Sequence, residues 1–178
     1  GIWKTTNKGT TWTPVFEGQP DNTFGDIAIF GGDSRVVWAG TGEQNNRQSS
    51  SWGGGVYRST DAGATWSFVG LKESGSIGRV VTHPTDPNIA WVAAVRHLWK
   101  PSSERGVFKT TDGGDTWAPM SDRYFGGTIG AIAVAESNPD IVYVGGGEYP
   151  IRGNTSHGDG VYKTTDGGKT FSKVLFVN

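Results

Sequence analysis

The chain has 178 residues, and its 16 basic and 17 acidic side chains leave a net charge of −1, which argues against a protein that grips nucleic acid through a basic face. It has no cysteine, which excludes disulfides and thiolate metal sites, and it has no apolar run long enough to span a membrane. Its 29 glycines and 8 tryptophans favour short strands joined by tight turns, so we expect one all-β domain.

A ten-residue motif occurs four times along the chain. Each copy begins and ends with an aromatic residue, and the copies start 54, 51 and 54 residues apart. The copies span residues 3–12, 57–66, 108–117 and 162–171. Self-similarity at this period is typical of proteins built from stacked copies of one structural unit.

A second element lies between successive copies of the motif. It opens at Phe24, Ile77 and Ile129, and an aromatic residue follows 14 positions later each time. The apolar runs around these two points predict two strands, A and B. We expect strand A near 25–30, 78–83 and 130–135, and strand B near 36–41, 89–95 and 141–146. The ten-residue motif then supplies strand C at its first aromatic residue and strand D after its last one.

Each complete unit therefore holds four short strands in about 50 residues, which is the size of a propeller blade. We predict an all-β fold, a β-propeller of four-stranded antiparallel blades, with about three and a half blades present as a partial ring. The predicted units of this single segment (1–178) are a half-blade of strands C and D (1–17) and three blades (24–70, 77–120 and 129–178). A solenoid is the structural alternative, although solenoid repeats are usually shorter.

The ten-residue motif contains the pattern Ser-x-Asp-x-Gly-x-Thr-Trp, which is complete in residues 59–66. The other copies carry threonine for the serine, and two of them differ further at Asn7 and Phe171. The pattern resembles the Asp-box, or BNR, motif of propellers that include sialidases, xyloglucanase-type glycoside hydrolases, sortilin-type receptors and a photosystem assembly factor. The spacing, with an Asn-Pro or Asp-Pro turn before strand B, most resembles secreted microbial proteins of the sortilin and xyloglucanase-like branch.

We expect the Asp-box to be a structural turn between strands C and D. Its carboxylate can accept backbone N–H groups across the turn, its glycine supplies an unusual backbone angle, and its aromatic ring packs on neighbouring strands. A calcium site is the alternative, but it needs more oxygen ligands than the sequence places there, so we predict no metal and no cofactor. The predicted structural residues are Asn7, Gly9, Trp12, Asp61, Gly63, Trp66, Asp112, Gly114, Trp117, Asp166, Gly168 and Phe171.

The connections between the predicted strands differ in how constant they are. The A–B and C–D turns keep one length, whereas the B–C and D–A loops vary. Because function concentrates in variable loops on a rigid scaffold, we expect a ligand on the edge formed by the B–C and D–A loops. Trp52 and Trp99 are the two tryptophans outside the repeat, and both lie in B–C loops. They either bind a sugar or a protein or fold back to cover the edges of the blades.

Further ligand-binding candidates in these loops are aromatic, cationic and imidazole side chains. They are Tyr124, Tyr149, Arg47, Arg96, His97 and Arg152, and Phe125 also has no counterpart in the repeat. Three loop arginines on successive units resemble the carboxylate clamp of sialidases, because a guanidinium group binds a carboxylate through two hydrogen bonds. The sialidase Arg-Ile-Pro motif is absent, however, and loop arginines commonly face solvent or pair with a nearby acid. The three histidines lack the spacing of a metal site.

Glu43 and Glu148 end strand B in equivalent places two blades apart, and they are the strongest acid candidates. The two carboxylates of a glycosidase lie roughly 5–9.5 Å apart, whereas we expect more than about 10 Å between residues on blades this far apart. The alternative is a structural carboxylate that caps backbone amides of its loop.

We therefore expect a non-catalytic scaffold that binds a protein or a glycan through its B–C and D–A loops, as part of a larger secreted protein. The alternative is a segment of a glycoside hydrolase that resembles xyloglucanase-type enzymes. Because a motif is already under way at Gly1 and a propeller usually needs four to eight blades, we expect further blades from the same or another chain. An extracellular, periplasmic or cell-surface location follows from the resemblance alone.

Overall fold

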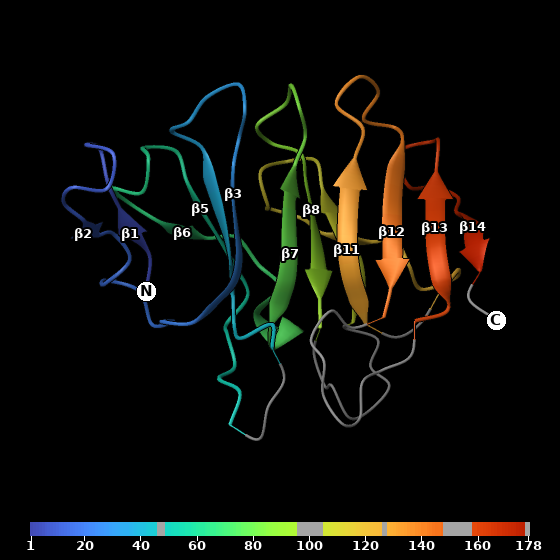
Figure 1. Cartoon of the computed structure of the whole chain (residues 1–178), viewed down its shortest axis with the longest axis horizontal. Coiled ribbons are helices and arrows are strands. Elements are labelled where there is room, and N and C mark those ends of the chain that lie inside the picture. Colours follow the sequence, from blue (N-terminus) through green and yellow to red (C-terminus); the bar gives the residue numbers. More distant parts are fainter. Residues whose placement is uncertain (46–48, 96–104, 126–127, 148–157, 177–178) are drawn as a thin grey trace.

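The computed structural model describes residues 1–45, 49–95, 105–125, 128–147 and 158–176. These residues form one two-stranded sheet and three four-stranded sheets, which follow one another across the molecule in chain order (Figure 1). No helix in the described ranges is long and apolar enough to cross a membrane.

The strands occur in chain order within each sheet. The N-terminal sheet pairs β1 (Trp3–Lys4) with β2 (Thr13–Pro14). The first blade holds β3 (Phe24–Ile29), β4 (Val37–Thr41), β5 (Val56–Ser59) and β6 (Ser67–Phe68), and a short 3-10 helix, η1 (Lys72–Ser74), follows it. The second blade holds β7 (Ile77–Thr82), β8 (Ala90–Ala94), β9 (Gly106–Thr110) and β10 (Ala118–Pro119). The third holds β11 (Ile129–Val134), β12 (Val142–Gly146), β13 (Gly160–Thr164) and β14 (Ser172–Phe176).

All neighbouring strands in these sheets are antiparallel, so the predicted all-β propeller of four-stranded antiparallel blades is confirmed. The outermost strands β2, β6 and β10 are only two residues long, and Pro14 and Pro119 lie in two of them. Proline offers no N–H group to a further strand, and short edge strands resist pairing with other chains. These strands therefore suit the outer rim of each blade.

The blades stack through their inner strands. β3 lies against β7, and β7 lies against β11. Gly40 in β4 permits this approach, because a Cβ atom there would lie 2.4 Å from the side chain of Ile77. Ile77 and Val80 of β7 are buried together with Trp38 of β4 in one apolar cluster that spans the first two blades. A second cluster joins the second blade to the third in the same way.

Each Asp-box is a turn fixed by its own side chains. Asp61 Oδ1 accepts hydrogen bonds from Ser59 Oγ and from Thr65 N, both at 2.8 Å, and Asp61 Oδ2 accepts one from Thr65 Oγ1 at 2.6 Å. The same three contacts recur at Asp112 and Asp166. All three carboxylates therefore hold their turns as hydrogen-bond acceptors.

The N-terminal copy makes the same turn with an amide. Asn7 Oδ1 accepts a hydrogen bond from Thr11 N at 2.9 Å, and Asn7 Nδ2 donates one to Thr11 Oγ1 at 2.8 Å. The threonine hydroxyl is thus an acceptor here and a donor in the other copies. Gly9 and Gly63 have φ values of +87° and +85°, a backbone region that favours glycine. The turn can therefore also form with an amide in place of the carboxylate, provided that the side chain has the same length and that glycine follows.

The aromatic residue that closes each complete Asp-box docks on the unit before it. Trp66 Nε1 donates a hydrogen bond to Val15 O at 2.7 Å, and Trp117 Nε1 donates one to Val69 O at 2.6 Å. Phe171 has no N–H group to donate, and it packs against the second apolar cluster. This contact joins successive units at their outer strands, away from the inner-strand packing.

Two lysines in strand C reach the turn of the next unit. Lys4 Nζ donates a hydrogen bond to Ala62 O at 2.8 Å, and Lys109 Nζ donates one to Gly167 O at 3.0 Å. Ala62 and Gly167 hold the same place in their Asp-boxes, directly after the aspartate. The repeat therefore includes a polar link between units as well as apolar packing.

The A–B turns and the described part of the first B–C loop lie at opposite edges of the molecule. The turns that join β3 to β4, β7 to β8 and β11 to β12 lie along one edge (Figure 1). The described part of the connection from β4 to β5 lies at the other edge (Figure 1). The second edge is the one that the variable B–C loops were predicted to occupy.

Replacement of Trp91 should destabilise the protein much more than the same change at Tyr143. The two residues hold equivalent places in strand B, but their exposed fractions are 1% and 39%. Trp91→Ala removes a ring buried between two blades and should cost about 3–5 kcal/mol of unfolding free energy. Tyr143→Ala should cost about 1 kcal/mol. Urea unfolding followed by circular dichroism measures both, and equal losses would contradict the blade-stacking account.

The Asp-boxes should make the protein sensitive to acid. Hydrogen bonds from threonine and serine hydroxyls and from backbone N–H groups lower the pKa of Asp61 and of Asp112 to about 2, with the Thr65 and Thr116 hydroxyls as the largest causes. A lowered folded-state pKa stabilises the fold above the unfolded-state pKa of about 3.9, and this stabilisation is lost as the pH falls toward 2.

We therefore expect the urea midpoint to stay level above about pH 5 and to fall between about pH 4 and pH 2. Asp112→Asn copies the natural amide of Asn7. It should reduce the number of protons taken up on unfolding by about one, so the midpoint should fall less steeply with pH. Unfolding curves at a series of pH values measure the slope. If the midpoint falls equally steeply with pH in the variant and in the parent, the Asp112 carboxylate does not contribute to the acid sensitivity.

Candidate functional site

The B–C loop of the first blade (42–55, described except for 46–48) is anchored at both ends. The hydroxyl of Thr41, the last residue of β4, donates a hydrogen bond to Gly55 O at 2.7 Å and accepts one from Gly55 N at 3.0 Å. Gly42 N donates to Thr23 O at 2.9 Å. The loop therefore leaves and re-enters the sheet at fixed points.

Three consecutive glycines carry this loop back across the end of β4. A Cβ atom on Gly53 would lie 2.3 Å from the carbonyl carbon of Thr41, and one on Gly54 would lie 2.8 Å from the Asp21 carboxylate. Gly53 N also donates a hydrogen bond to Gly75 O at 2.6 Å, which ties the loop to the connection that enters β7. Only residues without a side chain allow the backbone to approach this closely.

Trp52 directly precedes these glycines, and 64% of its surface is exposed. The backbone that follows it is fixed against β4 and against the next blade, so the indole is carried by an anchored segment. An exposed aromatic side chain on an anchored loop is a suitable surface for the face of a sugar ring or for a protein anchor. A ligand-binding role for Trp52 stays a prediction.

Glu43 closes the loop through Ser51. Glu43 N donates a hydrogen bond to Ser51 O at 2.9 Å, and Ser51 N donates one to Glu43 Oε2 at 2.9 Å. Ser50 Oγ donates to Asn45 O at 3.1 Å within the same loop. The carboxylate thus accepts a backbone amide, which is the contact that a structural cap makes.

A buried tyrosine lies under the glycine segment. Tyr57 donates a hydrogen bond from its hydroxyl to Asp21 Oδ2 at 2.9 Å. Burial, together with the hydrogen bond and the charge of Asp21, raises the pKa of Tyr57 to about 12. The sequence did not predict this pair, because the two residues are 36 positions apart and Asp21 lies outside the ten-residue motif that Tyr57 opens.

The two aromatic residues of the connection from β10 to β11, Tyr124 and Phe125, lie against the third blade. Tyr124 donates a hydrogen bond from its hydroxyl to Lys169 O at 3.1 Å, and its ring lies 5.6 Å from that of Phe171. Phe125 is buried, and its ring stacks on Tyr162 at 4.3 Å. Phe125 therefore belongs to the core and not to a ligand surface, whereas the predicted binding role of Tyr124 is left as a prediction.

Several predicted site residues lie outside the described residues. They are Arg47, Arg96, His97, Trp99, Glu148, Tyr149 and Arg152. Among the described residues, no three histidine or acidic side chains come together in a way that could hold a metal ion. Of the predicted site residues that the structure describes, Glu43 and Trp52 lie in one loop.

Comparison with known proteins gives both a family and curated relatives. The model of the family described as "Sortilin, neurotensin receptor 3" matches residues 54–176. A xyloglucanase of Hypocrea jecorina (strain QM6a) is 32% identical over 129 residues, which cover 65% of this chain and 14% of the relative. Xyloglucanase Xgh74A of Acetivibrio thermocellus is 26% identical over 144 residues, covering 65% of this chain and 15% of the relative. The chain therefore spans about one seventh of the length of these relatives.

Solved structures share the fold over nearly the whole chain. The GH74 enzyme of Niastella koreensis superposes with a TM-score of 0.73 at 24% identity and covers 99% of this chain and 26% of that chain. The GH74 xyloglucanase of Xanthomonas campestris superposes with a TM-score of 0.61 at 18% identity, covering 84% and 22%. At these identities the likeness establishes the propeller fold alone.

Replacement of Gly53 should test the close approach that anchors the loop. Gly53→Ala places a methyl group against the end of β4 and should cost about 1–3 kcal/mol of unfolding free energy. Gly18→Ala is the matched control, because no atom lies within 4 Å of a Cβ atom there, and it should change stability by less than about 0.5 kcal/mol. Urea unfolding measures both variants, and a Gly53→Ala protein as stable as the control would show that the loop is not held in this way.

Proposed function

The chain belongs to the family described as "Sortilin, neurotensin receptor 3", and on that premise we propose that it is a non-catalytic propeller scaffold that binds a glycan at its B–C loop edge. The proposed ligand is a β-glucan polysaccharide of the xyloglucan class. The proposed location is extracellular, where such polysaccharides occur.

The exposed indole of Trp52 is the observation that carries this proposal. Its exposed fraction is 64%, and the glycines after it are fixed by steric contact and by the hydrogen bond from Gly53 to Gly75. An aromatic anchor loses little conformational freedom on binding when the loop that carries it is already ordered. The apolar face of a glucose ring can then stack on the indole.

The names of the curated relatives favour a glycan over a protein ligand. The relatives from Hypocrea jecorina and Acetivibrio thermocellus are both called xyloglucanases, and the match to each covers 65% of this chain. Because the chain spans only 14–15% of these relatives, their whole activity is not carried over. Only the class of polysaccharide, xyloglucan, is taken from the names of these relatives.

The position of Glu43 favours binding over hydrolysis. A general acid must present its proton to the leaving oxygen of the substrate, and a nucleophile must reach the sugar carbon. The Glu43 carboxylate instead accepts the Ser51 amide at 2.9 Å inside its own loop. Among the described residues no second acid lies in this loop, so a hydrolase would have to draw its acids from elsewhere.

Trp52→Ala should weaken binding to soluble xyloglucan by about tenfold or more, because an aromatic anchor that a ligand covers commonly contributes about 1–2 kcal/mol or more. Affinity gel electrophoresis and isothermal titration calorimetry measure the change. Trp12→Ala is the matched control, since Trp12 is exposed to a similar fraction of 55% but belongs to the half-blade Asp-box. Trp52→Phe, which keeps a ring, should retain part of the affinity.

Equal affinities for Trp52→Ala and the parent would remove the basis of this proposal. The hydrolase alternative is tested on the same samples by release of reducing sugar from xyloglucan. Turnover that is lost in Glu43→Gln while binding persists would establish the alternative instead. A protein ligand would be indicated by an interaction that is sensitive to Trp52→Ala without any affinity for the polysaccharide.

A further inference from the structure

The inner strand of each blade contains a β-bulge near its first residues. The pairing of β7 with β8 shifts register between Ile77 and Arg79, and the pairings of β3 and β11 shift at the equivalent positions. A bulge redirects the side chains beside it and is common next to functional sites. The residue after the bulge is Asp26, Arg79 or Ala131 in the three blades. The repeat therefore does not require an arginine at this position.

Arg79 lies beside the first B–C loop. β7 begins at the edge where this loop lies (Figure 1), and Arg79 is its third residue. Arg79 Nη1 donates a hydrogen bond to Gln44 Oε1 of the loop at 3.1 Å and one to Gly78 O at 3.3 Å. A Cβ atom on Gly78 would lie 3.8 Å from Gln44 Cγ. The side chain of Gln44 therefore lies close to the bulge and holds the guanidinium group from the loop side.

The same loop carries Trp52. Gln44 lies near the start of the loop and Trp52 near its end. Gly53 N, next to Trp52, donates a hydrogen bond to Gly75 O at 2.6 Å. The start of the loop is thus tied to Arg79, and its end is tied to a residue four positions earlier in the chain. The guanidinium group and the indole are therefore both held beside one anchored loop.

Most of the hydrogen-bonding capacity of Arg79 is unused. A guanidinium group carries N–H donors on all three nitrogens, and only Nη1 has partners among the described residues. Nε and Nη2 are not buried atoms, so solvent reaches both. In the described part of the chain no carboxylate forms an ion pair with Arg79, whereas Arg35 uses its Nε and Nη2 to bind Asp33. The Nε and Nη2 side of Arg79 is therefore open to a ligand.

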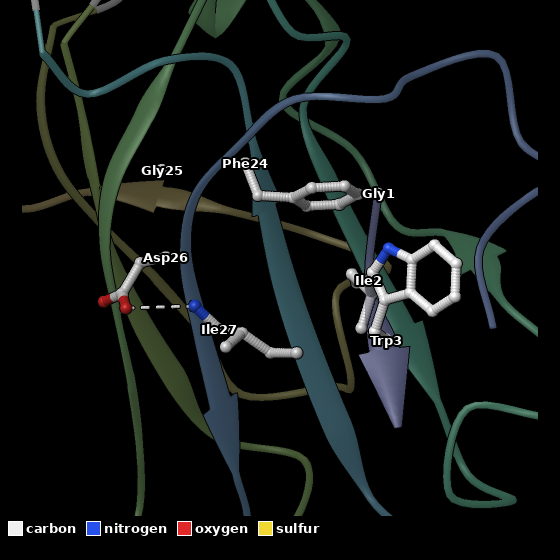
Figure 2. A pocket seen from close by; sticks show the side chains of 7 residues that line it. All are labelled: Gly1, Ile2, Trp3, Phe24, Gly25, Asp26 and Ile27. Atoms are coloured by element: carbon white, nitrogen blue, oxygen red, sulfur yellow. Dashed lines mark hydrogen bonds between the residues drawn. The ribbon is translucent and has the colours of Figure 1, made fainter. Parts of the chain in front are cut away.

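The charges around Arg79 favour a neutral ligand over an anion. Asp26 accepts hydrogen bonds at both carboxylate oxygens, from Ile27 N at 3.0 Å (Figure 2) and from Val80 N at 2.9 Å. Val80 directly follows Arg79, and Glu43 directly precedes Gln44, so carboxylates lie on both sides of the guanidinium group. A negative ligand would be repelled by these carboxylates. A ligand that offers hydroxyl groups would not.

On the premise of the proposed function, we propose that Arg79 binds two adjacent hydroxyl groups of the glycan that stacks on Trp52, and that Gln44 positions Arg79 for this contact. The Nε and Nη2 donors point in nearly the same direction and match two oxygens that lie side by side. In a 1,4-linked glucan backbone, the hydroxyls on C2 and C3 form such a pair. Arg79 thus selects for free hydroxyls, whereas the indole selects for the apolar face of the ring.

Methylation of the ligand tests this contact. The probes are soluble xyloglucan and the same polymer after O-methylation, and isothermal titration calorimetry measures both. Arg79→Ala should weaken binding to the unmodified polymer by about tenfold, because it removes hydrogen bonds from a charged donor. Methylation should weaken binding by the parent by about tenfold or more, and it should cost the Arg79→Ala variant at least about fivefold less.

Further variants separate the binding residue from the residue that positions it. Arg79→Lys keeps the charge but loses the pair of parallel donors, so it should recover less than about threefold of the lost affinity. Gln44→Ala should weaken binding by about threefold, and Gln44→Glu, which keeps an acceptor, should bind within about twofold of the parent. Gln44→Ala should add nothing to Arg79→Ala, because Gln44 acts through Arg79.

Arg35→Ala is the matched control, because Arg35 is already paired with Asp33 and lies in the turn between β3 and β4. It should leave the affinity unchanged. All these variants should keep the urea midpoint of the parent within about 0.5 M, since none removes a core side chain.

The outcomes distinguish this inference from the proposed function. Loss of affinity in Trp52→Ala without loss in Arg79→Ala would overturn the inference and leave the proposed function standing. A parent chain that does not bind xyloglucan would remove both. If methylation costs Arg79→Ala as much as it costs the parent, Arg79 does not contact the hydroxyls and the inference fails. Tighter binding of polygalacturonate than of xyloglucan, lost in Arg79→Ala, would assign the guanidinium group to a carboxylate instead. If Arg79→Ala does not fold, Arg79→Lys must show the reduced cost of methylation, or the inference fails.

Discussion

The packing of one blade's inner strands on the next is the interaction on which the rest of the molecule depends. A single four-stranded sheet has apolar side chains on both faces and is stable only when neighbouring units cover them. Gly40 brings β4 close enough to bury Ile77 and Val80, and the second apolar cluster repeats this arrangement one blade further on. The Asp-boxes and the tryptophans that close them hold the outer strands in the alignment that this packing requires.

A second constraint explains why one edge of the blades is uniform and the other is free to vary. Arg58 lies 5.1 Å from the centre of the Trp38 ring and donates a hydrogen bond to Pro87 O at 3.1 Å in the next blade. Lys109 makes the corresponding contact with Trp91 at 4.9 Å. Such cation–π contacts restrict which side chains and turn lengths fit at the edge where the A–B turns lie. The connections at the opposite edge differ in length from blade to blade, and loops of that kind on a rigid scaffold commonly carry function.

The candidate site could be predicted only in part. Trp52 was singled out by subtracting the repeat, and its ligand-binding role stays a prediction. The contact between Glu43 and a backbone amide of its loop was weighed from the sequence, but Ser51 was not identified as the partner, because the two residues are eight positions apart in a loop. The Tyr57–Asp21 pair gave no signal, because it depends on how a distant segment passes under the loop. Loop paths follow from steric limits such as those at Gly53, and these act between segments rather than along the sequence.

The sequence by itself determined the blades, their order and their turns. Strands and tight turns depend on residues that are close in the sequence. The spacing of the Asp-boxes and the alternation of apolar residues are patterns of this kind, so they can be recognised without the tertiary structure. The tertiary structure alone decided which equivalent residues are buried. Ile27 and Val80 have nearly the same side chain and the same place in the repeat, yet they are 46% and 5% exposed. Burial depends on the neighbour that covers a residue, and the repeat pattern is the same whether or not that neighbour is there.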